Sequence, residues 1–197
     1  MSAEYERYLE RLNKILYLEL VPKTAVFDYF TEHVYARDRD ANSAEPLMWF
    51  IQSGLYSDVT FSLFRLIDRG GDRNIYHFLD HAEQSLSSIH WKTPLTLADI
   101  SKHRSSLDAI KPQIENLKKR RNKVFGHYDK AFFYEPDSIN AAFPFSNDDA
   151  KTLVRTLQGI LSAHALALNG TATVSVEGFF YLAAERLFEK LRAHREA

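Results

Sequence analysis

Residues 47–67 read LMWFIQSGLYSDVTFSLFRLI, the most apolar long stretch of the chain. In a helix, these apolar residues would cover almost the whole circumference, which is the pattern of a buried helix. Asp58, Ser62 and Arg65 are spaced by three or four positions, and Asp68 continues the series, so they form one polar stripe. We therefore expect a central buried helix in which Arg65 forms an ion pair with Asp58 or Asp68, because a buried charge needs a partner.

Apolar residues recur at helical spacing on both sides of this segment. Only 7 glycines and 6 prolines interrupt the 197 residues, which favours long helices over short strands. Thr96 with Asp99, and Ser146 with Asp149, have the spacing of helix-capping boxes. Helices are predicted at 3–36 with a break or kink at Pro22, at 75–87, from 96 to about 125 with a kink or a new start at Pro112, from 146 to 169, and at 179–192 with Leu182 and Leu187 facing inward.

The fold class that follows from this pattern is all-α. Hydrophobic residues make up 45% of the chain, which is enough for a packed core and excludes a disordered chain. We expect one domain, residues 1–197, with a core at about 44–168. The N-terminal helices at 3–36 and the C-terminal helix at 179–193 are expected to pack on that core.

The bulk composition restricts the classes of function. The chain has 25 basic and 26 acidic residues, so a site for a polyanion must come from a local cluster of cations and not from a global field. Cysteine is absent, which excludes disulfides and thiolate metal sites and fits a reducing compartment. No apolar run approaches the roughly 20 residues that span a bilayer, and no signal peptide is recognisable. We expect a cytoplasmic protein without a membrane segment.

Residues 118–127 read KKRRNKVFGH, with five cations in six positions and then a histidine. Arg121 stays charged and can bind two phosphate oxygens, whereas His127 can exchange a proton near neutral pH. Together they suffice for metal-free RNA cleavage: His127 takes the 2′-hydroxyl proton or protonates the leaving 5′-oxygen, and Arg121 holds the phosphate. DNA lacks this hydroxyl, so the chemistry implies RNA. The alternative is an ordinary cationic helix end that faces the helix dipole.

The spacing of this stretch raises a geometric question. On a regular helix Arg121 and His127 are about 240° apart and do not share a face. Either Gly126 loosens the last turn or a second protomer completes the site. Arg120 lies seven positions before His127 and shares its face, so it is the rival of Arg121. Lys118, Lys119, Arg120 and Lys123 are expected to attract and bind RNA.

The stretch RRNKVFGH resembles the signature of the HEPN superfamily (higher eukaryotes and prokaryotes nucleotide-binding), an all-α domain. Its motif is an arginine, usually followed by a polar residue, with a histidine after four to six intervening residues. Here Arg121 is followed by Asn122, and five residues separate Arg121 from His127. Residues 58–68 also resemble the D-x-x-x-x-L-x-R-L-x-D core of the abortive-infection-protein branch, in which an asparagine follows. The resemblance covers roughly residues 47–164.

This resemblance implies a metal-independent endoribonuclease that needs no cofactor and acts as a homodimer, with the two motifs facing each other across the interface. Many such proteins are toxins or act in phage defence, some with an antitoxin or another regulatory protein. Arg121 and His127 would be catalytic, and Asn122 would orient the histidine or the phosphate. Toxins regulated by nucleotidyltransferase antitoxins carry a tyrosine two residues after the histidine; Asp129 stands there, so that mode of regulation is not implied.

A second hypothesis is a non-catalytic HEPN module that binds nucleotide, RNA or a partner protein. The absence of a marked basic cluster outside residues 118–123 favours it. On either hypothesis two roles are open for the stripe of Asp58, Arg65 and Asp68. Its charges form an ion pair with one another, or they position Arg121 and His127 from behind.

The remaining candidates have plain structural interpretations. His77 and His81 have a spacing that suits zinc, but no third ligand follows, so a polar helix face is expected. His164 lies among apolar residues and is expected to be a satisfied core histidine. His33, His90, His103 and His194 are expected at the surface or in loops. The aromatic residues of loop 128–145 either stack on unpaired bases or pack on the core or on a second subunit: Phe132, Phe133, Tyr134, Phe143 and Phe145.

Overall fold

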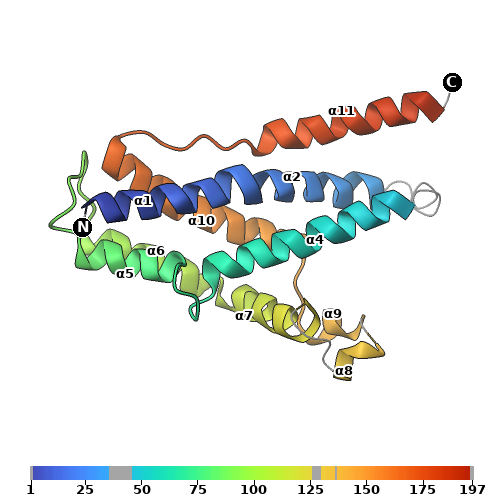
Figure 1. Ribbon diagram of the computed structural model, residues 1–197, viewed down its shortest axis with the longest axis horizontal. Coiled ribbons are helices and arrows are strands. Elements are labelled where there is room, and N and C mark those ends of the chain that lie inside the picture. The colour runs from blue at the N-terminus through green and yellow to red at the C-terminus, as the bar shows by residue number, and fades with distance from the viewer. Residues whose placement is uncertain (1, 36–45, 126–129, 136, 196–197) are drawn as a thin grey trace.

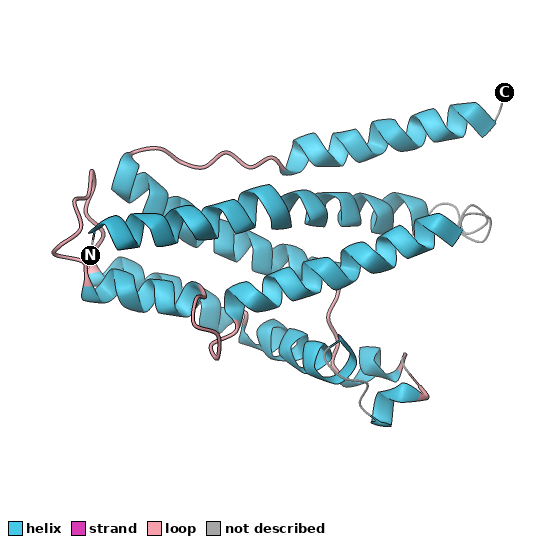
Figure 2. Ribbon diagram, viewed as in Figure 1, coloured by secondary structure: helices cyan, strands magenta, loops and turns pink. Residues whose placement is uncertain are grey.

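The computed structural model describes residues 2–35, 46–125, 130–135 and 137–195. Over these ranges the chain forms helices joined by turns and loops, and none of the described residues is in a strand (Figures 1 and 2). The predicted all-α class is confirmed. No described helix has both the length and the apolarity that crossing a membrane requires.

The first 34 described residues form one continuous rod along the bundle (Figure 1). It consists of α1 (Ser2–Asn13), the π-helical η1 (Lys14–Leu20), α2 (Val21–Tyr29) and the π-helical η2 (Phe30–Tyr35). We expected a break or kink at Pro22, but the helical path is unbroken there. Pro22 lies in the first turn of α2. The N–H of Val21 donates to the carbonyl of Leu16, five residues back. This wider turn is compatible with the missing N–H and the ring of the following proline.

The apolar segment forms α4 (Pro46–Ile67), but only its second half is buried. Val59, Leu63 and Ile67 are almost fully covered, whereas Trp49 is 60% exposed and Phe50 is 69% exposed. The expectation of a helix buried along its whole length is thus wrong for the first turns. A helix that is apolar all round is buried only where other helices pack against it. The start of α4 lies near the end of the N-terminal rod, away from the centre of the bundle (Figure 1).

The remaining helices follow the predicted order, except for two short helices within residues 128–145, which were expected to form a loop. They are α5 (Ile75–Gln84), α6 (Leu97–Ala109), α7 (Lys111–Arg120), the π-helical η3 (Arg121–Phe125), α8 (Lys130–Phe133), α9 (Ser138–Ala142), α10 (Asn147–Asn169) and α11 (Glu177–Arg195). Pro112 opens α7 as a new helix. Both predicted capping boxes are present, at the starts of α6 and α10. Gly170 ends α10 with a left-handed φ of 70°, which a residue with a Cβ rarely adopts.

The main core lies where α1, η1, α5, α6, α7 and α10 pack around the second half of α4. By contrast, α11 lies along α2 on the outside of the bundle (Figure 1). Ala184 and Phe188 of α11 are buried against Tyr29 and Phe30. Leu182 and Leu187 were expected to face inward, but they are 48% and 54% exposed, because the face turned to α2 passes through Ala184 and Phe188.

Candidate functional site

The predicted cationic motif lies at the end of α7 and in the π-helical turn η3. Lys118, Lys119 and Arg120 occupy the last turn of α7, where cations face the negative end of the helix dipole. Arg121 then begins η3, a wider turn that changes the direction in which successive side chains leave the helix. Both segments pack against α4. Arg120 therefore belongs to the last turn of α7, whereas Arg121 belongs to η3, and their side chains have different surroundings.

Arg120 is directed into the protein and is only 6% exposed. Its Nε donates to the carbonyl of Phe143 at 2.6 Å, and its two terminal nitrogens donate to the hydroxyl of Tyr56 and to Oδ1 of Asn140. All three nitrogens are thus engaged by α4 and by the segment around α9. The prediction that Arg120 binds RNA, or that it rivals Arg121, is corrected: burial and these bonds make it a structural residue that holds α9 against α7.

Arg121 has different surroundings and is only partly buried. Its guanidinium carbon lies 4.7 Å from the centre of the Phe64 ring, and one terminal nitrogen donates to Oδ1 of Asn122 at 3.0 Å. Its Nε is buried, and no hydrogen-bond partner for it exists among the described residues. A ring contact and a neighbouring amide therefore orient the guanidinium, and part of the side chain stays exposed. Such a planar donor set suits a phosphate.

The other predicted residues of the motif surround this arginine. Lys118, Lys119, Asn122 and Lys123 are exposed, and the ammonium of Lys119 lies 5.4 Å from the centre of the Phe143 ring. His127 lies in residues 126–129, outside the described residues. The relation between Arg121 and His127, and the role of a second protomer, therefore stay predictions.

The polar stripe on α4 does not form the expected buried ion pair. Asp58 pairs with Lys23 of α2 at 2.5 Å, and Arg65 is exposed and donates to the Ser62 hydroxyl at 3.3 Å. Asp68 accepts from the N–H of Gly70 at 3.2 Å, at the end of α4. The predicted ion pair of Arg65 with Asp58 or Asp68 is therefore wrong, because the stripe faces α2 at one end and solvent at the other. It consists of separate local contacts, and none of those given above reaches Arg121.

His164 lies at the centre of a buried polar chain elsewhere in the core. Its Nδ1 is 2.5 Å from the Tyr5 hydroxyl, and its Nε2 is 3.1 Å from Nδ1 of His103. If Tyr5 donates to His164, then His164 must carry its proton on Nε2 and donate to His103. Burial lowers the pKa of His164 to about 3 and also lowers the pKa of His103. The prediction of a satisfied core histidine is confirmed, and the surface placement of His103 is corrected.

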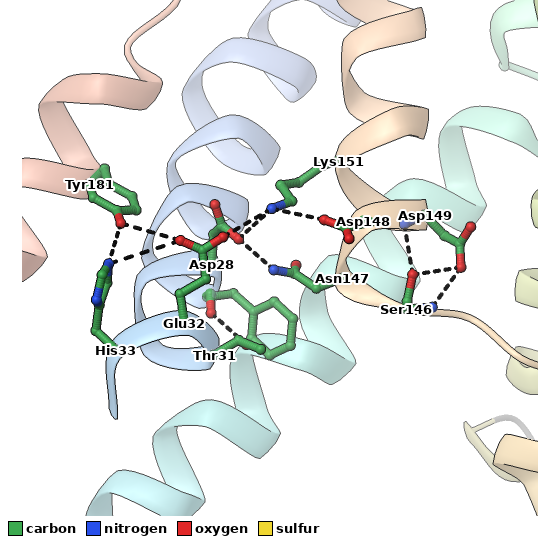
Figure 3. Close-up of polar contacts among 11 residues, drawn as sticks. Asp28, Thr31, Glu32, His33, Ser146, Asn147, Asp148, Asp149, Lys151 and Tyr181 are labelled. Atoms are coloured by element: carbon green, nitrogen blue, oxygen red, sulfur yellow. Dashed lines mark hydrogen bonds and ion pairs between the residues drawn. The ribbon is translucent and has the colours of Figure 1, made fainter. Parts of the chain in front are cut away.

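A further polar cluster joins α2, η2, α10 and α11 (Figure 3). Lys151 of α10 contacts the carboxylates of Asp28 at 2.9 Å, Asp148 at 3.0 Å and Glu32 at 3.3 Å. Burial acts to lower the pKa of Lys151, but the hydrogen bonds to these carboxylates outweigh burial, so the pKa is raised. His33 was expected at the surface, yet its Nε2 lies 2.5 Å from the hydroxyl of Tyr181 on α11. These groups form hydrogen bonds and ion pairs with one another, and the contacts of Tyr181 attach α11 to the bundle.

The aromatic residues between η3 and α10 divide into two groups. Phe145 is 6% exposed and joins the core, and Phe132 packs against Phe143 with ring centres 6.0 Å apart. Phe133 and Tyr134 are 57% and 81% exposed, with their rings edge to face at 5.1 Å. Packing on the core is thus confirmed for Phe145, whereas Phe132 and Phe143 are partly buried against each other.

Comparison with known proteins gives one match. The HEPN family model with the description AbiU2 matches residues 2–187, which is nearly the whole chain. Comparisons with curated proteins and with solved structures gave no match. The matched range includes the Arg121 region, the buried chain at His164 and most of α11.

Proposed function

Because the chain belongs to the AbiU2 family of HEPN proteins, we propose that it is a metal-independent endoribonuclease of the toxin or phage-defence type. HEPN domains are often ribonucleases, so a nuclease role of the abortive-infection kind agrees with the family. The specific reaction, the residues that perform it and the homodimeric site are our proposal.

In this mechanism His127 acts as general acid or base, and Arg121 stabilises the phosphate. Removal of the 2′-hydroxyl proton lets that oxygen attack the adjacent phosphorus, and protonation of the 5′-oxygen lets the downstream strand leave. The products are a 2′,3′-cyclic phosphate and a 5′-hydroxyl. Arg121 compensates the negative charge that develops on the phosphate oxygens. Asn122, which accepts a hydrogen bond from Arg121 at 3.0 Å, keeps the guanidinium in position.

The observation that carries the proposal is the contrast between two adjacent arginines. Arg120 is 6% exposed and uses all three nitrogens on protein acceptors, whereas Arg121 is partly exposed, lies against Phe64 and donates to Asn122. An arginine oriented on one side and available on the other has the properties that phosphate binding requires. Lys118, Lys119 and Lys123 add local positive charge near it, in a chain whose net charge is −1.

The test is cleavage of single-stranded RNA in the presence of EDTA. Wild type should produce fragments with 2′,3′-cyclic phosphate ends, and Arg121→Ala and His127→Ala should each lower the rate by roughly 10²- to 10³-fold. Arg155→Ala is the matched control, because Arg155 is an exposed arginine on α10. Absence of cleavage over a varied set of RNAs would overturn the proposal.

The homodimeric site has its own test. If Arg121 of one protomer acts with His127 of the other, a mixture of Arg121→Ala and His127→Ala proteins should regain activity, since some mixed dimers contain one intact site. A mixture as inactive as its components, although the protomers exchange, would place both residues in one chain.

The alternative is a non-catalytic HEPN module that binds a partner protein, RNA or nucleotide. The specific observation in its favour is the outer face of α11, where Phe179, Leu182 and Leu187 are 71%, 48% and 54% exposed. Apolar side chains in such a row are typical of a protein interaction surface. This function would be preferred if wild type proved inactive and bound another protein through α11.

A further inference from the structure

A cavity of about 190 Å³ lies between α4, α5 and α7, and one of its lining residues, Phe64, also contacts Arg121. Phe64 connects the two, because it lines the cavity and also carries the guanidinium of Arg121 on its ring at 4.7 Å. On α7 the lining residues Lys111, Glu115 and Lys118 are spaced by three or four positions, and Arg121 is the next position in that series. One face of α7 therefore leads from the cavity to Arg121.

The size of the cavity limits what it can hold. Pockets that enclose a whole small molecule usually have volumes of about 300 Å³ or more. The occupant of this cavity should therefore be part of a longer molecule, and the base of one nucleotide in an RNA chain is such a part.

The charges of the lining suit a nucleotide better than a free phosphate. Arg69, Lys111 and Lys118 provide three cations, but Asp68 and Glu115 provide two carboxylates. A bare anion would be repelled by the carboxylates, whereas a nucleotide can place its phosphate near the lysines and the N–H groups of its base near a carboxylate.

The cavity also has a surface on which a base can stack. The guanidinium of Arg69 lies over the ring of Tyr76, 4.1 Å from its centre, and both residues line the cavity. An arginine positioned over an aromatic ring offers a cationic π surface, and unpaired bases commonly stack on such guanidinium groups. A base can reach it only outside a duplex, so the cavity would select single-stranded RNA.

We propose that this cavity binds the base of the nucleotide next to the scissile phosphate, against the Arg69–Tyr76 pair, while the backbone of that nucleotide runs along Lys118 and Lys111. This inference rests on the proposed function, because it takes the phosphate at Arg121 as the point of cleavage. It adds a subsite that determines which RNA is accepted: a strand whose nucleotide beside the cut is unpaired.

Binding of a fluorescent 2′-fluoro RNA 12-mer tests the subsite without depending on cleavage, because this RNA lacks the attacking hydroxyl. Lys111→Glu should weaken binding about tenfold, since a cation near the backbone becomes an anion. Lys102→Glu makes the same change at an exposed lysine of α6 that is not in the cavity lining, and should leave binding unchanged. Equal effects of the two variants would overturn the proposal, as would equal binding of the 12-mer and its blunt duplex.

An abasic strand of the same length tests the stacking platform. Wild type should bind the base-containing strand roughly tenfold more tightly than the abasic strand, and Arg69→Ala should remove most of that preference. Arg73→Ala is the matched control, because Arg73 lies over the ring of Tyr8 at 5.2 Å, away from this cavity. Loss of the preference in both variants, or in neither, contradicts the proposal.

The two levels of inference fail separately. If wild type binds the 12-mer through Lys111 and Arg69 but cuts no unmodified RNA, the endoribonuclease proposal fails and the subsite stands as a binding site. If wild type cuts RNA and these residues have no effect on binding, the subsite fails alone.

Discussion

The polar chain of Tyr5, His164 and His103 and the pair of Arg121 and Asn122 are both set among apolar helices, but their hydrogen bonds are completed differently. His164 is fully buried, and both ring nitrogens have protein partners. Arg121 is oriented by Phe64 and Asn122, and its buried Nε has no described partner. The first cluster stabilises the fold and offers nothing to a ligand. The second keeps part of a charged guanidinium at the surface, which is the property expected of an anion-binding site.

The largest effect should separate the two neighbouring arginines at the end of α7. Arg120→Met should lower the free energy of unfolding by about 3 kcal/mol, because it removes a buried guanidinium together with its three hydrogen bonds. Arg121→Met should lower it by less than about 1 kcal/mol, since only the contact with Phe64 and one exposed hydrogen bond are lost. Urea denaturation of both variants measures the difference. Equal losses would mean that Arg121 is as structural as Arg120.

A pH dependence of about 2 kcal/mol should come from His164. The unfolded chain binds a proton at a histidine pKa near 6.5, whereas burial lowers the pKa of His164 to about 3 in the folded protein. The unfolded state therefore binds more protons as the pH falls, so stability is greatest above about pH 6.5 and falls by about 2 kcal/mol between pH 7 and pH 5. The lowered pKa of His103 acts in the same direction.

Urea denaturation at pH 7, 6 and 5 measures this dependence, with His164→Gln as the comparison. Glutamine cannot take up a proton, so the variant should lose the contribution of His164 over this range. Free carboxylates titrate mostly below it. Parallel pH dependences in the two proteins would show that His164 is not held neutral by burial.

The sequence predicted the elements of the fold better than their environment. Helix positions and both capping boxes follow from local chemistry, namely the apolar period and the Thr96–Asp99 and Ser146–Asp149 spacings, and the structure confirms them. The exposed start of α4 and the outward face of α11 were not predictable in this way. Which side of a helix is covered depends on helices that are distant in sequence, and α11 meets α2 across about 150 residues.

The candidate site shows the same limit at the level of single residues. The motif directed attention to residues 118–127, which lie within the range that the family model matches. It did not distinguish Arg120 from Arg121, because the partners that bury Arg120 are Tyr56, Asn140 and the Phe143 carbonyl. Nothing in the sequence around these three residues indicates that they bind an arginine. Likewise, the pairing of Asp58 with Lys23 depends on how α2 crosses α4.

The smallest of the expected effects tests whether the chain at His164 is as complete as its geometry indicates. Tyr5→Phe removes the hydroxyl 2.5 Å from Nδ1 of His164 and keeps the ring in its stack on Phe78. The buried nitrogen then lacks a donor, which should cost about 1.5 kcal/mol in the free energy of unfolding. Tyr134→Phe makes the same change at a side chain that is 81% exposed, and should have almost no effect. If Tyr5→Phe were equally harmless, His164 would gain little from the tyrosine, and the contrast with Arg121 would rest on burial and not on completed hydrogen bonds.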